Sequence, residues 1–392
     1  MRIILANKFY YHRGGDCIYT INLEKLLKQH GHDVAVFAMN FPNNINTEWN
    51  KYFPSEVNFK FGLGMIEAFM RPFGTSEVMR KFAMLLNDFN PDVVHLNNIH
   101  SQLSPAIAEI AHKKGIKVIW TLHDYKLLCP RYDCLQNGIK VCEKCFDDKH
   151  NVLRYKCMKN SVIASYLSYF EATKWNRKKI ESITDIYVCP SKFMASKMNQ
   201  GKFSKKKLFV LNNFIDIKKC YRENYSRKNY YCYIGRLSEE KGVETLINAA
   251  NSLPYKLKVI GDGPLRQELE RLSTANKIEF VGKKDWNEIK GLVGNARFIV
   301  IPSEWYENNP LSVIEALCLG TPVLGANIGG IPELIDESFN GMLFESRNVE
   351  NLRCKIDEMW NASFQYAEIA KVSQDRYNAE KYYDEIMKIY KN

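Results

Sequence analysis

Two glutamates, Glu307 and Glu315, lie in the segment ENNPLSVIEALCLG, on either side of a strong helix-start signal. Asn309 is a good N-cap residue, and Pro310 suits the first helical position because its missing N–H would be unpaired there. The preceding residues 297–302 (RFIVIP) are typical of a buried strand. The free N–H groups of a helix that starts after such a strand bind phosphate. The alternative is an amphipathic helix with two solvated acids.

A second segment contains basic residues that could bind the same phosphate as this helix. Arg236 and Lys241 belong to the loop GRLSEEKG, between a predicted strand at 230–234 and a predicted apolar helix at 243–251. Two cations that flank a glycine-containing loop are what a diphosphate site requires. Glu315 lies about one and a half turns inside its own helix, so it can reach a ligand along the first turns, such as a ribose.

Two glycines near the start of the chain are candidates for contact with a phosphate or a sugar. Gly14 and Gly15 follow the first predicted strand, residues 2–6, and precede a helix and a second strand at 33–38. Glycine allows the backbone of such a loop to come close to a ligand. The loop lacks a G-x-G-x-x-G pattern, and a purely structural turn is an equal alternative.

Polar residues also follow two later strands of the first half. Asn97 and Asn98 come directly after the predicted strand 91–96, and His123 follows the predicted strand 117–122. Ligands bind at the carboxyl ends of parallel strands, where these side chains would gather. A lone histidine is usually structural, but two polar strand ends at one sheet edge favour a functional His123.

Four cysteines, Cys129, Cys134, Cys142 and Cys145, lie in a loop that belongs to the cysteine-rich segment 129–157. The C-x-x-C spacing of the second pair is typical of metal ligands, and four thiolates in one loop could hold a structural zinc. The wider spacing of the first pair is less typical of a zinc site. Reduced, metal-free thiols that act as small buried apolar residues are the alternative.

The composition sets the broad class of the protein. A length of 392 residues predicts two domains, and 46% apolar with 25% charged residues is typical of a globular protein. The chain has no apolar run long enough to span a bilayer and no signal peptide, so we expect a cytoplasmic protein. Its net charge of +11 favours an anionic partner: a phosphate-bearing substrate, an anionic lipid or a nucleic acid.

Residues 154–179 are rich in basic and aromatic side chains. On helices this pattern favours a surface that rests on anionic lipid, as a peripheral contact with the inner face of a membrane. The alternative is an ordinary solvated basic face. No recognised nucleic-acid motif accompanies the basic charge, so we expect no nucleic-acid partner.

The alternation of strands and helices predicts an α/β protein with two Rossmann-like halves. We expect one domain over residues 1–220 and a second over 221–372, joined by a polar linker that begins at residue 220. We expect residues 373–392 to form a C-terminal helix that packs back on the first domain. A nucleotide fits between such halves.

Together these motifs resemble retaining glycosyltransferase family 4, over nearly the whole chain. The most specific is E-x(7)-E, formed by Glu307 and Glu315. GRLSEEKG, GDGP, TLHD and GTPV…GGIPE support it. The resemblance implies the GT-B fold, with two Rossmann-like domains facing a central cleft. One departure is that the family's N-G-V-D-like segment reads Asn213-Phe214-Ile215-Asp216 here.

The resemblance implies roles for the residues of the second half, the donor domain. Arg236 and Lys241 would hold the sugar-nucleotide diphosphate and neutralise the leaving group, without a catalytic metal or a cofactor. Backbone N–H groups around Asn309 to Leu311 would orient the sugar and the phosphate. Glu315 would bind the ribose hydroxyls.

The resemblance also implies which groups contact the sugar. Glu307 would bind the hydroxyls of the donor sugar, and His123 would lie near its anomeric carbon. Gly14 and Gly15 would let the first, acceptor-side domain approach the phosphates. Retention would follow from front-face attack, in which the leaving phosphate helps to deprotonate the acceptor. Positioning and electrostatic stabilisation would then carry the rate without an enzyme nucleophile.

The expected activity is transfer of a hexosyl group from a nucleoside-diphosphate sugar to a glycan or lipid-linked glycan, in bacterial surface polysaccharide synthesis. One alternative on the same fold is a nucleotide-sugar epimerase, which normally lacks the ENNPLSVIE pattern. Another is a phosphorylase, which needs a pyridoxal lysine site that we do not identify. A non-catalytic module that binds an anionic ligand is a third alternative.

Overall fold

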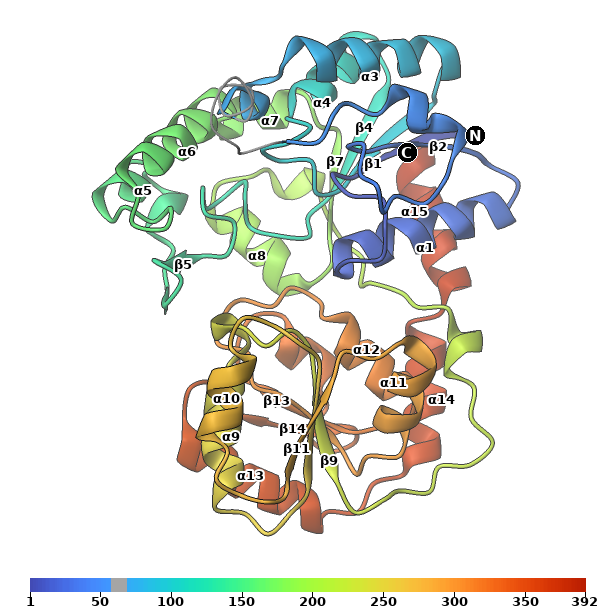
Figure 1. Ribbon diagram of the computed structural model, residues 1–392. Helices are drawn as coiled ribbons and strands as arrows, with labels where there is room; N and C mark the ends of the chain where they lie inside the picture. Colours follow the sequence, from blue (N-terminus) through green and yellow to red (C-terminus); the bar gives the residue numbers. More distant parts are fainter. Residues whose placement is uncertain (58–68) are drawn as a thin grey trace. The chain divides into compact units, whose positions relative to one another are not determined.

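Continuous apolar runs form the strands of a parallel sheet in the first part of the protein. The computed structural model describes residues 1–57 and 69–392, and Figure 1 shows its helices and strands. Ile3 to Ala6 are fully buried in β1 because parallel strands are covered on both faces. The strand order is β2-β1-β3-β4-β7-β8. The strands are β1 (Arg2–Ala6), β2 (Asp33–Phe37), β3 (Val93–Leu96), β4 (Lys117–Thr121), β7 (Ile186–Cys189) and β8 (Leu208–Val210).

Helices connect these parallel strands, as crossover connections require. In Figure 1, α3 and α4 lie above the sheet and α1 lies below it. A short hairpin, β5 (Leu135–Gln136) and β6 (Lys140–Val141), lies in the cysteine-rich segment. The helices are α1 (Gly15–Gln29), α3 (Ser76–Phe89), α4 (Ala106–Lys113), α5 (Asn151–Arg154), α6 (Val162–Lys174), α7 (Arg177–Ser182) and α8 (Lys192–Gln200).

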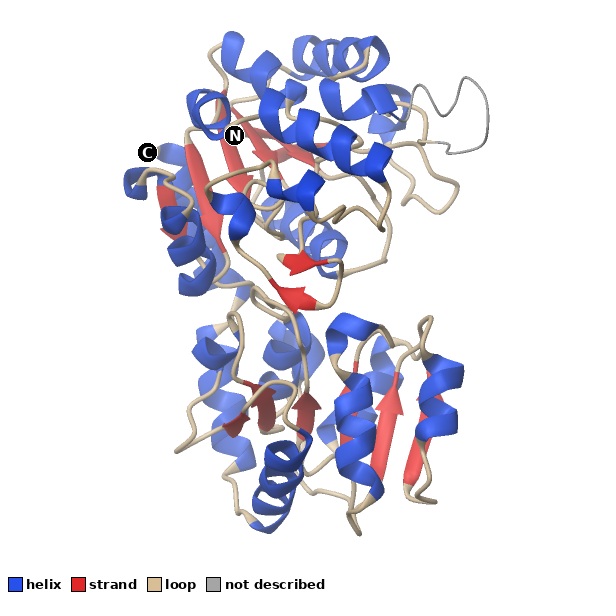
Figure 2. Ribbon diagram, turned by 90° about the vertical axis from the view of Figure 1, so that its left-hand side faces the viewer, coloured by secondary structure: helices blue, strands red, loops and turns tan. Residues whose placement is uncertain are grey.

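The second half contains another parallel sheet, in the order β11-β10-β9-β12-β13-β14. Its strands are β9 (Tyr231–Ile234), β10 (Leu257–Ile260), β11 (Ile278–Gly282), β12 (Ile299–Ile301), β13 (Val323–Ala326) and β14 (Gly341–Phe344). Figure 2 shows the strands of each half enclosed by helices. The helices are α9 (Val243–Asn251), α10 (Arg266–Leu272), α11 (Trp286–Gly294), α12 (Leu311–Cys318), α13 (Val349–Asn361), α14 (Tyr366–Arg376) and α15 (Ala379–Lys391).

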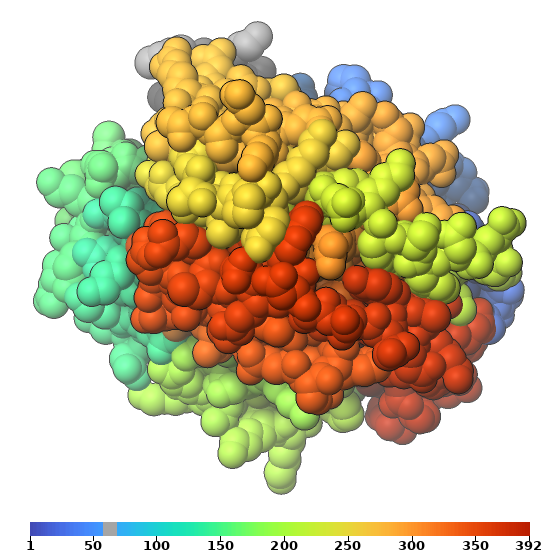
Figure 3. Space-filling view, turned by 90° about the horizontal axis from the view of Figure 1, so that it is seen from below, coloured from blue at the N-terminus to red at the C-terminus, as the bar shows by residue number. Residues whose placement is uncertain are grey.

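Two apolar cores cover the two faces of the second sheet. One core contains buried side chains of α12, including Val313 and Leu317, and the other contains those of α9, including Leu246. In the space-filling view of Figure 3 the orange-red residues of α13 and α14 form a continuous band on the surface of this unit. Trp360 of α13 stacks on Tyr255 with 4.2 Å between ring centroids. Short 3-10 helices are Glu48–Tyr52, Arg71–Phe73, Lys144–Phe146, Lys205–Lys207, Ile217–Cys220, Glu239–Lys241 and Ile331–Leu334.

The chain divides into two compact units whose limits differ from the expected domain boundaries. The first unit contains residues 1–137, 142–211 and 383–392, and the second contains 138–141 and 212–382. The main segment of the second unit therefore begins at residue 212, eight residues ahead of the end of the expected first domain at residue 220. Ile215 forms a β-bridge with Asn378, and Cys220 is fully buried in a core of the second unit.

The expected helix at the C-terminus is two helices. α14 ends at Arg376 and α15 begins at Ala379, because the Tyr377 carbonyl accepts the N–H of Ile215 and Asn378 accepts the N–H of Glu380. Residues 383–392 of α15 belong to the first unit.

Two contacts, of which the first is buried, hold this end of α15 in the first unit. Tyr390 is hydrogen-bonded to Nδ1 of buried His95 over 2.6 Å, and Tyr383 stacks on His30 at 3.6 Å. Within the described residues, we find no helix with both the length and the apolar character needed to cross a membrane.

Candidate functional site

The loop after β9 and the loop after β12 meet through a glycine. Lys241 ends the short turn before α9, and Gly242 follows with a φ of +64°. A Cβ atom at Gly242 would lie 1.9 Å from the carbonyl oxygen of Pro302, directly after β12. Only glycine fits this approach and this backbone conformation without strain. The contact places Lys241 beside the loop that carries Glu307.

Lys241 and Glu307, which were both predicted as site residues from the sequence, form an ion pair. The Lys241 Nζ lies 2.6 Å from Glu307 Oε1, and the Ser303 hydroxyl donates to the same oxygen over 2.8 Å. Burial by itself raises the pKa of Glu307, but the Lys241 charge and the hydrogen bonds outweigh it and lower the pKa below its usual value. Glu307 is therefore a carboxylate at neutral pH and is unsuited to act as a general acid.

The glycines of the GGIPE segment hold the backbone of Glu307. The N–H of Gly330 donates to the Glu307 carbonyl over 2.7 Å. Gly329 has a φ of +63°, and a Cβ atom there would lie 2.4 Å from the same carbonyl oxygen. The loop after β13 therefore fixes the position of Glu307 through its main chain.

Arg236 differs from Lys241 in its surroundings. Its side chain is exposed, and its backbone carbonyl accepts the Tyr233 hydroxyl over 2.8 Å. A Cβ atom at Gly261 would lie 1.9 Å from the carbonyl oxygen of Gly235, so the loops after β9 and β10 are in direct backbone contact. One glycine-rich edge of the sheet thus presents a lysine paired with a carboxylate and an exposed guanidinium.

The start of α12 differs from the sequence prediction. Asn309 is not the N-cap: Pro310 occupies that position with no side-chain cap, and the helix begins at Leu311. The Asn309 Oδ1 instead accepts the N–H of Asn213 over 2.8 Å, and the Asn213 amide donates to the Asn309 carbonyl over 2.8 Å. This pairing uses the oxygen that would cap the helix. The first N–H groups of α12 are left without a capping side chain and can receive an anion.

Glu315 lies in the second turn of α12 and is partly buried. Burial raises its pKa to about 7, although the charge of Lys219 opposes the shift. Its carboxyl group makes no hydrogen bond or ion pair with the residues that the structure describes. Such a group can accept hydrogen bonds from ligand hydroxyls when it is ionised.

The first unit contains a second polar cluster, at the carboxyl ends of β3 and β4. His123 Nε2 lies 2.9 Å from Asn97 Oδ1, and the Tyr19 ring contacts the imidazole edge-on at 4.8 Å. Asp16, in the first turn of α1, accepts a hydrogen bond from Asn98 over 3.1 Å. The polar strand ends predicted from the sequence therefore lie together around His123.

Electrostatics tie Asp16 to His123. Burial lowers the pKa of His123, and the Asp16 carboxylate opposes that shift only in part. Burial raises the pKa of Asp16, but His123, Lys8 and Asn98 outweigh it and lower the pKa below its usual value. The cluster presents a neutral imidazole beside a carboxylate, and the imidazole donates its Nε2 proton to Asn97.

Sequence reasoning gave no role to Asp16 or Tyr19. The available signal was an acid in the first helical turn after two glycines.

Gly14 is the N-cap of α1 and Gly15 its first residue, with no side-chain cap. Gly14 has an extended backbone, with a φ of −152°, so its conformation does not require glycine. Gly14, Gly15 and His123 belong to the first unit, and the residues predicted for the donor side belong to the second: Arg236, Lys241, Glu307, Asn309, Pro310, Leu311 and Glu315.

The structure does not assemble the four cysteines as zinc ligands. Cys129 and Cys134 are hydrogen-bonded to each other, and this bond lowers the pKa of Cys129 against the effect of burial. Cys145 packs with Val152 in a separate apolar cluster, while Cys142 is only partly buried. Across residues 1–57 and 69–392, no three His, Cys, Asp or Glu side chains form a group able to hold a metal.

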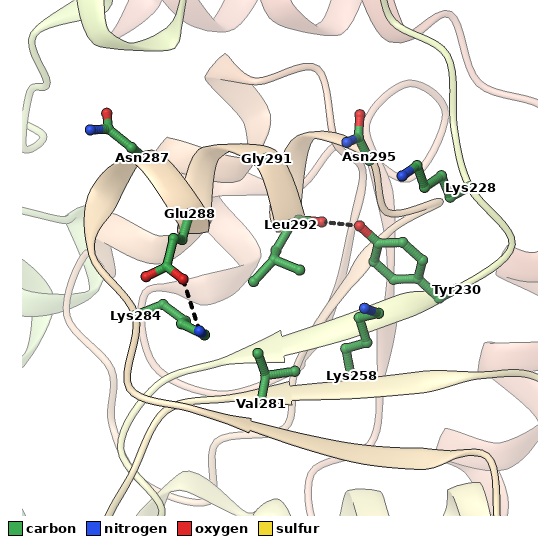
Figure 4. A pocket seen from close by; sticks show the side chains of 10 residues that line it. All are labelled: Lys228, Tyr230, Lys258, Val281, Lys284, Asn287, Glu288, Gly291, Leu292 and Asn295. Atoms are coloured by element: carbon green, nitrogen blue, oxygen red, sulfur yellow. Dashed lines mark hydrogen bonds and ion pairs between the residues drawn. The ribbon is translucent and has the colours of Figure 1, made fainter.

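A cavity of about 390 Å³ in the second unit is separate from the predicted site residues. It lies between α11 and the strands β9 to β11 (Figure 4). Lys284 is paired with Glu288 over 2.8 Å, and the Tyr230 hydroxyl donates to the Leu292 carbonyl over 2.7 Å. The lining residues are Lys228, Tyr230, Lys258, Val281, Lys284, Asn287, Glu288, Gly291, Leu292 and Asn295.

Comparison with known proteins finds relatives among glycosyltransferases. An uncharacterized protein of the cps region of Klebsiella pneumoniae is 26% identical over 353 residues, which cover 85% of this chain and 87% of that protein. An uncharacterized glycosyltransferase of Methanocaldococcus jannaschii, MJ1178, is 28% identical over 181 residues, which cover 45% of this chain and 50% of the relative. The chain thus spans half the length of that relative.

Solved structures share the fold. Sucrose-phosphate synthase from Thermosynechococcus elongatus superimposes with a TM-score of 0.72 at 16% identity, over 99% of this chain and 98% of that one. Anabaena HepE, solved in complex with UDP and glucose, gives 0.66 at 17% identity, over 99% of both chains.

Family models match both units. Residues 217–381 match the model described as Glycosyl transferases group 1. Residues 13–219, more than half of the 392, match the model described as Glycosyltransferase Family 4. The chain belongs to glycosyltransferase family 4 and has the GT-B fold, with two parallel α/β sheets of six strands each.

Proposed function

We propose that the protein transfers a sugar from a nucleoside-diphosphate sugar to a glycan or lipid-linked glycan, with retention of the anomeric configuration. The observation that carries the proposal is the Lys241–Glu307 ion pair beside the uncapped start of α12. In this pair the Lys241 ammonium would bind a phosphate, and the adjacent Glu307 carboxylate would bind sugar hydroxyls. The exposed guanidinium of Arg236 supplies a second cation on the same loop.

The donor diphosphate would meet these groups in a fixed arrangement. An ammonium has three N–H donors, so Lys241 can keep its bond to Glu307 and still donate to a phosphate oxygen. Arg236 and the N–H groups at the start of α12 would share the remaining charge. As the bond to the sugar breaks, negative charge grows on the diphosphate, and these donors stabilise it without moving. We therefore propose a reaction that requires no catalytic metal.

The remaining site residues would position the donor. Glu307 would accept hydrogen bonds from sugar hydroxyls, and Glu315 would accept them from the ribose. His123 enters the proposal as a neutral hydrogen-bonding group for the sugar, supported by its lowered pKa. The leaving phosphate would help to remove the acceptor proton, so the proposal assigns no side chain as nucleophile.

UDP-sugars are the first donors to test. HepE of Anabaena was solved with UDP and with UDP-glucose, and it shares the fold of this chain. For the acceptor, the relative from the Klebsiella pneumoniae cps region supports a role in surface polysaccharide synthesis. The proposal includes a cytoplasmic location at the inner face of the membrane, where lipid-linked acceptors are presented.

A thermal-shift screen of the full chain against UDP-, GDP- and ADP-sugars tests the donor assignment. A ligand at 100 times its Kd stabilises the folded state by about 2.7 kcal/mol, so one class of sugar nucleotide should raise the Tm clearly. The same donor should be slowly hydrolysed, or transferred when a glycan acceptor is added. If no sugar nucleotide raises the Tm and none is consumed, the proposal is wrong.

A further inference from the structure

Helix α6 buries polar side chains toward the first unit. Ser165, Ser168 and Glu171 are 0%, 6% and 6% exposed. Glu171 forms an ion pair with Lys126 over 2.8 Å, and Ser165 donates to the Ser161 carbonyl over 2.8 Å. Figure 1 shows α6 in green at the margin of the first unit, beside α5 and α7. The inward face of this helix is therefore held by polar contacts.

The outward face of α6 is apolar. Val162, Ile163, Tyr166 and Phe170 are 48%, 70%, 49% and 52% exposed. The spacing of Val162, Tyr166 and Phe170 places these three on one side of the helix, and Ile163 lies beside them. This order of faces is the reverse of an ordinary surface helix, which turns its apolar side to the core. We call these four residues the α6 apolar face.

The sequence around this face is strongly basic. Between residues 154 and 179 the only acidic residue is Glu171, which is buried and paired with Lys126. Arg154, Lys156 and Lys159 are exposed just before the helix. The basic residues of the segment are Arg154, Lys156, Lys159, Lys174, Arg177, Lys178 and Lys179.

We propose that the α6 apolar face, with the basic residues around it, is a docking surface for an anionic lipid bilayer. Aliphatic and aromatic side chains on one helical face enter the boundary between headgroups and acyl chains, and lysine and arginine attract the phosphates. A second copy of the chain is disfavoured as the occupant, because a symmetric contact would bring two equally basic segments together. Charge therefore selects an anionic membrane over self-association.

The docking surface depends on the proposed function in one respect. Only the proposed function supplies the lipid-linked acceptor that would be presented at the membrane where α6 docks. Docking itself requires neither a donor nor an acceptor, so the two proposals can fail separately.

Co-sedimentation of the full chain with lipid vesicles tests the docking surface. We expect binding to vesicles of phosphatidylglycerol and phosphatidylcholine, weaker binding to phosphatidylcholine alone, and a loss of binding as salt rises. The double variant Ile163→Ser/Phe170→Ser should reduce binding by about tenfold or more, because each side chain loses its transfer into the interface. Both positions are exposed, so the core is unchanged.

Matched controls come from exposed apolar residues on other helices. Met84 of α3 is 45% exposed and Val372 of α14 is 43% exposed. Met84→Ser and Val372→Ser should bind vesicles as the unmodified chain does. Lys156→Gln/Lys159→Gln should reduce the preference for anionic vesicles and flatten the dependence on salt.

Three outcomes distinguish membrane docking from self-association and from a failure of the transferase proposal. Equal binding of the Ile163→Ser/Phe170→Ser variant and the unmodified chain, or no preference for anionic vesicles, would overturn the proposal. Dissociation of a dimer by the same variant in sedimentation equilibrium, with vesicle binding unchanged, would assign the face to a second copy instead. Donor hydrolysis should be unaffected by the variant, so loss of vesicle binding alone leaves the transferase assignment standing.

Discussion

The Lys241 ammonium lies 2.6 Å from Glu307 Oε1, and the Ser303 hydroxyl donates to the same oxygen. Lys241 comes from the loop after β9 and Glu307 from the loop after β12, two strands that are neighbours in the sheet. Because the ammonium has further N–H donors, the pair can join the phosphate side of the proposed donor site to its sugar side.

Substitution of either partner should remove most of the transferase activity. Glu307→Gln removes the charge that holds Lys241, and Lys241→Ala removes a phosphate donor, so kcat/KM for transfer should fall by about 100-fold or more in each. Glu239→Gln, an exposed acid in the same loop, is the control and should leave kcat/KM unchanged. Near-normal rates in both site variants, with the fold intact by circular dichroism, would refute the donor-site assignment.

Donor affinity should depend on the ionisation of Glu315. Burial raises the pKa of this carboxyl to about 7. The ionised carboxylate accepts hydrogen bonds from ribose hydroxyls more strongly than the neutral acid does. The affinity for a sugar nucleotide should therefore rise with pH from 6 toward 8, and weaken by up to about tenfold per pH unit well below 7. Isothermal titration calorimetry across this range measures the effect. A sugar nucleotide is the right ligand because its diphosphate, esterified at both ends, does not titrate there.

Glu315→Gln supplies the control for this pH dependence. It keeps the size of the side chain and removes the titration, so the affinity profile should become flat. A profile that keeps its slope in Glu315→Gln would assign the titration to another group.

The histidine of the first unit should act in its neutral form. Burial lowers the pKa of His123, so kcat at saturating donor should show no loss near pH 6.5, the ordinary value for histidine. His123→Ala should lower kcat by about 10-fold to 100-fold, whereas His112→Ala, on an exposed part of α4, should not. An acid limb centred near pH 6.5 that disappears in His123→Ala would contradict the neutral assignment.

The pairing of Asn213 with Asn309 should support the second unit. Asn309→Ala leaves the N–H of Asn213 without its buried partner, which should lower the free energy of unfolding by about 1–3 kcal/mol. Asn287→Ala, at an exposed position of α11, is the matched control and should change it little. Calorimetric unfolding measures both. If the unfolding transition of Asn309→Ala is unchanged, the Asn213–Asn309 pairing does not contribute to the stability of the second unit.

The same variant separates two roles for Asn309. If Asn309 only braces the start of α12, donor affinity should fall together with stability. A fall in affinity with stability unchanged would instead indicate direct contact with the donor.

Most elements of the fold were accessible from the sequence, because local signals decide them. The run RIILA forms β1 and LKVI forms β10, since parallel strands covered on both faces need continuous apolar residues. The Arg236–Lys241 loop was found because glycine and basic residues follow a strand. The family resemblance supplied the roles that spacing alone could not assign.

Only the tertiary structure decided how distant residues pair. The N-cap preference of Asn309 was overridden because Asn213, 96 residues away in sequence, takes its oxygen. The C-terminal helix breaks at Tyr377 because that carbonyl accepts the N–H of Ile215. Asp16 interacts electrostatically with His123 only because the fold brings these two distant residues close together. Periodicity and spacing report on a residue's own segment, whereas a buried hydrogen bond depends on whichever group the fold brings to it.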